Sequence, residues 1–215
     1  MKIKAVTFDF DGVLVESNLI KDQAFATLAN EYPDHGVKML QYHEENKHSP
    51  RKQKFEYYAD HLFSDESRDE VIKSLNEQFS SLVVSQVSAC EAVKGSIECL
   101  DFLKSRCELF ISSVTPEPEL KKILENRGLL HYFNKVFGNP PIIKRDAINT
   151  VMTLVDATAG EILFVGDSIS DYQVSKEAGV HFLGRKSENY WKDESLFFVD
   201  DLLAAIPYII ENFGE

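Results

Sequence analysis

Cysteine is scarce in this chain of 215 residues. The three cysteines are Cys90, Cys99 and Cys107, and an odd number at this spacing fits neither a zinc site nor a complete set of disulfides. We therefore expect buried or reduced thiols in a cytoplasmic protein. Internal repeats and low-complexity tracts are also missing from the sequence, so we expect an ordinary globular fold.

Positive charge is scarce as well. Lys and Arg together number 23 against 35 Asp and Glu, which gives a formal net charge of -12. Because nucleic-acid backbones are held by clustered Lys and Arg, we expect no nucleic-acid partner. A small phosphorylated molecule is compatible with this charge, since it needs only a local positive site or a metal ion.

Long apolar runs are also missing. No uninterrupted apolar stretch approaches the roughly 20 residues of a membrane-spanning helix. Asp9 interrupts the first apolar run too early for a secretory signal. We therefore expect neither a membrane partner nor a leader peptide, although the 44% of hydrophobic residues is enough to build a core.

Short apolar runs are present, and each ends in small or acidic residues. The three strongest lie at 3–10, 108–113 and 161–168. They lack polar alternation, as buried parallel strands do when helices cover both faces of the sheet. Weaker strand candidates lie at 135–137, 180–183 and 196–199.

Helical patterns separate these runs. Apolar residues recur at helical spacing over 96–104, 116–127, 171–178 and 201–212. Thr115 is the predicted N-cap of the second helix, with Pro116 in its first turn. Alternation of strands and helices predicts an α/β fold with a doubly wound parallel sheet, similar to a Rossmann fold.

Residues 17 to about 90 differ, because they show helical periodicity and no convincing strand. We interpret this segment as a helical cap domain, residues 16–87, inserted after the first strand. The predicted core domain then consists of residues 1–15 and 88–215.

Polar side chains follow the predicted strands at their carboxyl ends, where ligands bind in open α/β sheets. They are Asp9 and Asp11, Ser112 and Ser113, Asp167 and Asp171, and Lys144 from a later loop. Crowded carboxylates need a cation, and hard oxygen ligands suit Mg²⁺. A carboxylate can attack a phosphate ester, and a second carboxyl can move the proton of the leaving oxygen. The alternative for Asp9 and Asp11 is a turn after the strand, with Gly12 supplying a positive φ.

Four motifs in this order resemble those of the haloacid dehalogenase (HAD) superfamily. They are D-x-D-G-V-L from Asp9, S-x-x-P from Ser113, the lysine Lys144, and G-D-x-x-x-D ending at Asp171. The helical insertion resembles the C1-type cap of the phosphatase branch. The stretch HSPRKQKFEYY is similar to cap segments of phosphoglycolate-phosphatase-like members.

The resemblance implies a role for each matching residue. Asp9 matches the nucleophile and a metal ligand. Asp11 matches the general acid/base, with its backbone carbonyl on Mg²⁺, and it argues against dehalogenase or phosphonate chemistry. Ser113, preferred to Ser112 for its spacing to the proline, matches the hydroxyl that binds the phosphoryl group. Lys144 matches the motif-three cation.

Asp167 and Asp171 match the remaining metal ligands. For both, a helix cap is the alternative. For Ser113 the alternative is also a cap, and for Lys144 it is a solvated lysine with Arg145 as the competitor.

The basic run from Lys47 to Lys54 has two interpretations. It is either a solvated helix face, or His48, Arg51 or Lys54 binds the distal group of the substrate. The aromatic residues that follow, Phe55, Tyr57 and Tyr58, are typical of a cap core.

The sequence thus predicts a Mg²⁺-dependent phosphatase, a phosphoric monoester hydrolase whose cap closes to exclude water. Its expected substrate is a small phosphate ester: phosphoglycolate, a sugar phosphate or a nucleotide monophosphate. One alternative is a phosphomutase of the β-phosphoglucomutase kind. Another is a non-catalytic HAD domain with a regulatory or binding role.

Overall fold

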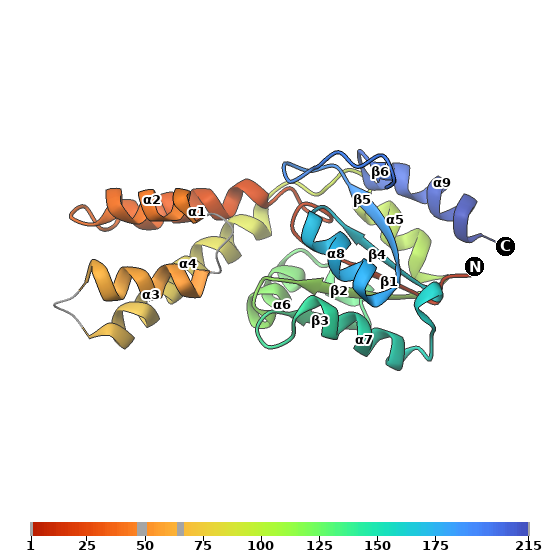
Figure 1. Ribbon diagram of the computed structural model, residues 1–215, viewed down its shortest axis with the longest axis horizontal. Helices are drawn as coiled ribbons and strands as arrows, with labels where there is room; N and C mark the ends of the chain where they lie inside the picture. Colours follow the sequence, from red (N-terminus) through yellow and green to blue (C-terminus); the bar gives the residue numbers. More distant parts are fainter. Residues whose placement is uncertain (1, 47–50, 64–66, 215) are drawn as a thin grey trace. The chain divides into compact units, whose positions relative to one another are not determined.

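The computed structural model describes residues 2–46, 51–63 and 67–214 (Figure 1). The chain forms two compact units. The α/β unit comprises Met1–Asn18 and Ser88–Glu215, and the helical unit comprises Leu19–Val87. Within the described residues, no helix is long and apolar enough to cross a membrane.

A parallel sheet forms the centre of the α/β unit. Its six strands, counted within the described residues, are β1 (Ala5–Phe8), β2 (Glu108–Ser113), β3 (Lys135–Gly138), β4 (Ile162–Gly166), β5 (His181–Arg185) and β6 (Phe198–Val199). Their spatial order is β3-β2-β1-β4-β5-β6, and all neighbours are parallel. The predicted fold class, a doubly wound α/β sheet, is confirmed.

Helices of the α/β unit follow the strands along the chain. They are α5 (Ser96–Lys104), α6 (Glu117–Asn126), α7 (Lys144–Leu154), α8 (Ile169–Ala178) and α9 (Leu202–Phe213), with short 3₁₀ turns η1 (Leu130–Tyr132) and η2 (Ala159–Glu161). Helices α5 and α9 pack on each other, as do α7 and α8. Phe110, Phe137 and Phe164 of the sheet pack with Ile148 and Val151 of α7 in one buried cluster. Because helices cover the sheet, the strand residues are buried, and the strand sequences are therefore continuous apolar runs.

The first strand is central and shorter than its apolar run. Only Ala5–Phe8 pairs as a strand, although the run extends over 3–10. Phe8 lies beside Ile111 of β2 and Val165 of β4 in the register. The residues that follow these three positions therefore emerge together at the carboxyl edge of the sheet.

Two chain segments connect the α/β unit to the inserted residues, and they pair with each other. Val15 and Ala92 form an antiparallel bridge. Glu16 N donates to Glu91 O at 2.9 Å. The segment that leaves the sheet therefore lies beside the segment that returns to it.

Four helices account for the insertion in the described residues: α1 (Asn18–Asn30), α2 (Gly36–Glu45), α3 (Arg51–His61) and α4 (Arg68–Ala89). Aromatic rings pack against one another in its core. The ring centroids of Phe25 and Phe79 are 4.5 Å apart, and those of Phe25 and Phe55 are 5.9 Å apart. Phe55 and Tyr58 are buried, and the Tyr58 hydroxyl donates to Met39 O at 2.8 Å.

A chain of polar side chains crosses three of these helices, and it is buried at His43 and Lys54 but partly exposed at Asp22. His43 Nε2 lies 3.1 Å from Asp22 Oδ1, and Lys54 Nζ lies 2.9 Å from His43 Nδ1. Lys54 is only 2% exposed and also lies over the Phe25 ring. The interpretation of the basic run as a solvated face is therefore wrong at Lys54, because its ammonium points into the unit rather than into water.

Arg51 and His48 are the other two residues of the basic run that are candidates for substrate binding. Arg51 is partly buried, and its guanidinium lies over the Phe79 ring, 5.4 Å from the centroid. His48 lies outside the described residues.

The contacts of His43 with Asp22 and Lys54 predict that the folded protein loses stability in mild acid. Burial and the Lys54 ammonium lower the pKa of His43 from its ordinary value of 6.5, against the opposing effect of Asp22 and Glu44. The unfolded chain therefore binds the proton at a higher pH than the folded chain does. This contribution to the free energy of unfolding is present above pH 6.5 and is lost as the pH falls below it.

The pH dependence of thermal unfolding measures this effect. We expect the drop in Tm between neutral and mildly acidic buffer to be smaller in His43→Gln than in the unaltered protein. The control, His61→Gln, alters an exposed histidine of the same unit and should leave the drop unchanged. Equal drops in His43→Gln and the unaltered protein would contradict the prediction.

Candidate active site

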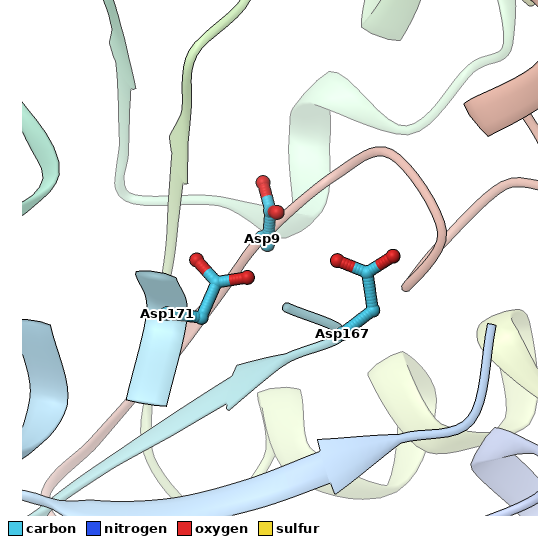
Figure 2. Close-up of side chains that lie close together, drawn as sticks. All are labelled: Asp9, Asp167 and Asp171. Carbon is cyan, nitrogen blue, oxygen red and sulfur yellow. The ribbon is translucent and has the colours of Figure 1, made fainter. Parts of the chain in front are cut away.

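Side chains from four separate segments meet at the carboxyl edge of the sheet. Asp9 follows β1, Asp167 follows β4, and Asp171 lies in the first turn of α8. Figure 2 shows these three carboxylates turned toward a common space. All three are buried, with exposed fractions of 6% or less. The parallel register of β1 and β4 explains the meeting of Asp9 and Asp167.

Lys144 provides the positive charge of the site. It is the first residue of α7, and its Nζ lies 2.8 Å from Asp9 Oδ2 and 2.5 Å from Asp171 Oδ1. Burial alone would lower the pKa of Lys144, but the charges of Asp171 and Asp9 outweigh it and raise that pKa. The competitor Arg145 is exposed and lies near Asp146 instead. The ammonium at the site is therefore that of Lys144.

The three carboxylates form a group that fits a metal ion. Within the described residues, Asp9, Asp167 and Asp171 each offer an oxygen, and these oxygens lie within 4.8 Å of one another. Burial raises the pKa of Asp9 well above its ordinary value, and the neighbouring charges of Asp171 and Asp167 raise it further, although Lys144 opposes them. One lysine therefore does not compensate three buried carboxylates, and a hard divalent cation suits the remaining charge.

Asp11 is held by two hydroxyl groups. Its Oδ1 accepts from Ser17 Oγ at 2.6 Å, and its Oδ2 accepts from Thr115 Oγ1 at 3.0 Å. Its side chain is outside the metal-binding group of the described residues. The sequence assigned only the Asp11 backbone carbonyl to the metal, and that assignment stays a prediction.

Thr115 is not the cap of α6, so that prediction is wrong. The N-cap position is Pro116, which has no side-chain hydrogen bond, and the helix begins at Glu117. The Thr115 hydroxyl donates to Asp11, while its backbone N donates to Ser113 Oγ at 3.1 Å. Ser113 is buried, and among the described residues its own hydroxyl proton has no acceptor. That proton is available to an oxygen of a bound molecule.

Asp171 has two roles in the structure. Its Oδ2 accepts from Ser168 N at 3.2 Å and Ser168 Oγ at 2.6 Å, which completes a capping box at the start of α8. Its Oδ1 forms the ion pair with Lys144. Asp167 does not cap this helix, because Ser168 is the N-cap. The capping alternative therefore applies to Asp171 alone, together with its place at the site.

The loop after β5 contributes two residues that sequence reasoning missed. Asp167 Oδ2 accepts from Ser187 Oγ at 2.6 Å, Asn189 Nδ2 at 3.3 Å and Asn18 Nδ2 at 2.8 Å. Burial raises the pKa of Asp167, and the hydrogen bonds from Ser187 and Asn18 oppose that rise. The available signal was the weak strand at 180–183, whose carboxyl end lies at the same edge as the other site residues.

Gly12 allows Asp167 to approach the loop after β1. Its φ is +72°, a left-handed conformation that favours glycine. A Cβ at this position would lie 2.1 Å from Asp167 Oδ2. The glycine after the two aspartates is therefore required both by the turn and by the close contact with Asp167.

Comparison with known proteins gives consistent matches. A family model described as haloacid dehalogenase-like hydrolase matches residues 6–185. A phosphoglycolate phosphatase from Pseudomonas savastanoi pv. phaseolicola is 30% identical over 226 residues, covering 99% of this chain and 82% of the relative.

Two solved structures share the fold. One is described as a predicted phosphoglycolate phosphatase from Haemophilus somnus; it superposes with a TM-score of 0.76 at 19% identity and covers 97% of this chain and 98% of that chain. The other is a hydrolase of the haloacid dehalogenase-like family from Streptococcus pneumoniae, with a TM-score of 0.69 at 22% identity and coverage of 97% and 99%.

Proposed function

Because the chain belongs to the haloacid dehalogenase-like hydrolase family and is a phosphatase of that family, we propose that it hydrolyses a small phosphorylated metabolite through an aspartyl-phosphate on Asp9, with Mg²⁺ as cofactor. One observation carries the proposal. A buried carboxylate, Asp9, is ion-paired to Lys144 beside two further carboxylates and within the same loop as Asp11. We also propose that the protein is located in the cytoplasm.

In the first step an Asp9 carboxylate oxygen attacks phosphorus, and the bond from phosphorus to the ester oxygen breaks. Asp11 in its protonated form gives its proton to the leaving oxygen, so the alcohol departs neutral. Lys144 and the Ser113 hydroxyl bind phosphoryl oxygens and stabilise the charge that they carry in the transition state.

In the second step water attacks the phosphorus of the aspartyl-phosphate. Asp11, now a carboxylate, takes the proton of that water, and the bond from phosphorus to the Asp9 oxygen breaks. Inorganic phosphate leaves, and both aspartates return to their starting forms. Ser17 and Thr115 hold the two Asp11 oxygens, which keeps the carboxyl oriented through both steps.

Asp9, Asp167 and Asp171 would hold the metal, together with the Asp11 carbonyl. When bound, Mg²⁺ supplies positive charge that lets an anionic nucleophile and a phosphate dianion approach each other. The donor set supports this assignment, because all these ligands are hard oxygen atoms.

Phosphoglycolate is the first substrate to test, because the relative at 30% identity is named a phosphoglycolate phosphatase. A sugar phosphate is the second. Substrate choice is proposed to depend on the helical unit, with Arg51 as its best cationic candidate. His48 and Lys54 are the other two residues proposed to bind the substrate. For Lys54, the buried contact with His43 favours a structural role.

A panel of phosphorylated metabolites tests the proposed function. We expect inorganic phosphate to be released in proportion to substrate consumed, with phosphoglycolate or a small sugar phosphate giving the highest kcat/KM. The same panel with Arg51→Ala should raise KM for the preferred substrate by about tenfold if the guanidinium binds its distal group. Isomer formation without phosphate release would identify a phosphomutase instead. No turnover on any ester would identify a non-catalytic domain.

A further inference from the structure

Asp167 receives three hydrogen bonds from the part of the chain that the structure describes, and all of them reach the same oxygen. Oδ2 accepts from Ser187 Oγ at 2.6 Å, from Asn18 Nδ2 at 2.8 Å and from Asn189 Nδ2 at 3.3 Å. Among the described residues, Oδ1 accepts none. Two lone pairs are available on each carboxylate oxygen. Oδ2 is therefore saturated by the protein, whereas Oδ1 keeps its full capacity for another ligand.

The hydroxyl of Ser187 has a defined direction. Its oxygen accepts from the backbone N of Asn189 at 2.9 Å, and its single proton is donated to Asp167. The loop reaches Asp167 because β4 and β5 pair in parallel, with Gly166 beside Gly184. Ser187 lies just beyond the end of β5, and Asp167 just beyond the end of β4.

The orientation of the Asp167 carboxylate determines which of its two oxygens faces Asp9 and Asp171. Figure 2 shows one Asp167 oxygen on the side of Asp9 and Asp171 and the other pointing away. An unrestrained carboxylate in this position could rotate to offer either oxygen or both. Groups that hydrogen-bond a metal ligand fix its orientation, and their loss typically weakens metal affinity by about 10–100-fold.

We propose that Ser187, supported by Asn189, is a positioning residue that holds Asp167 so that Oδ1 alone binds the metal. The inference rests on the proposed function, because it assumes a Mg²⁺ site at Asp9, Asp167 and Asp171. It extends the site to the loop after β5, which contains none of the four sequence motifs.

The test is calorimetric titration of Mg²⁺ into the full chain, without substrate. We expect Ser187→Ala to weaken Mg²⁺ affinity by about 10-fold or more, and Ser187→Thr, which keeps the hydroxyl, to restore most of it. Asn189→Ala removes a longer hydrogen bond and should weaken affinity by a smaller factor. The matched control is Ser195→Ala. It removes a hydroxyl that donates to Asp193 at 2.6 Å rather than to Asp167, so this variant should bind Mg²⁺ as the unaltered protein does.

The possible outcomes separate this inference from the proposed function. If the unaltered protein binds Mg²⁺ and hydrolyses esters but Ser187→Ala binds it equally well, the positioning role is wrong and the function stands. If the unaltered protein binds no Mg²⁺, the metal site and this inference fail together. If Ser187→Ala unfolds, Asn189→Ala decides, and an unchanged affinity in that variant overturns the inference.

Discussion

An Asp9→Asn variant is expected to lose phosphate-ester hydrolysis by on the order of 10⁴-fold or more, because it removes the proposed nucleophile. Asparagine keeps the size of the side chain but has no anionic oxygen to attack phosphorus. The ion pair with Lys144, at 2.8 Å, is lost at the same time. The measurement is the initial rate of p-nitrophenyl phosphate hydrolysis at saturating Mg²⁺.

The control for this variant is Asp146→Asn. Asp146 is exposed and lies in the same α/β unit, two residues after Lys144, so its replacement should leave the rate unchanged. Both variants should have thermal unfolding midpoints close to that of the unaltered protein. Activity retained in a folded Asp9→Asn protein would exclude the aspartyl-phosphate mechanism.

Removal of the metal is expected to have a comparable effect. With Asp9, Asp167 and Asp171 buried together, Lys144 alone leaves an excess of negative charge that repels a phosphate dianion. Loss of several kcal/mol of transition-state stabilisation corresponds to about 10³-fold or more in rate. We therefore expect dialysis against EDTA to abolish hydrolysis and added Mg²⁺ to restore it.

A second readout of the metal does not depend on activity. Mg²⁺ should raise Tm at constant ionic strength, because a ligand that binds only the folded state stabilises it by about 2.7 kcal/mol at 100 times its Kd. Added Ca²⁺, which is larger and prefers more ligands, should restore less activity than Mg²⁺. Full hydrolysis after exhaustive chelation would show that the carboxylates serve another purpose.

The fold class was predictable because its signals are local. The helix predicted at 96–104 has those ends in the structure, since Gly95 takes a left-handed conformation before it and Lys104 ends the apolar periodicity. Strand ends are different, because partner strands determine them. The run at 3–10 pairs only over Ala5–Phe8, where its neighbours offer matching positions.

The candidate site was predictable where a residue lies shortly after a strong strand or in the first turn of a helix. Thr115 was wrongly predicted as a cap because the acceptor of its hydroxyl, Asp11, is 104 positions away in the sequence. Ser187 was missed because it follows a weak strand and resembles any polar loop residue. For Lys54 the sequence left open a solvated face and a substrate contact, and its buried contact with His43 could not be predicted because His43 belongs to another helix. In each case a contact distant in sequence decides the side chain's role.

The pairing of Val15 with Ala92 affects how well the protein tolerates changes in the length of the inserted segment. It brings together the two ends of the insertion, so residues 19–87 form a loop that is already closed at its base. Loop-closure entropy grows only logarithmically, by about 0.6 kcal/mol for each doubling of loop length. Insertions or deletions within residues 19–87 therefore have little entropic effect on the α/β unit. Every group proposed to act in hydrolysis belongs to that unit, so the whole insertion can be exchanged while the proposed chemistry stays in place.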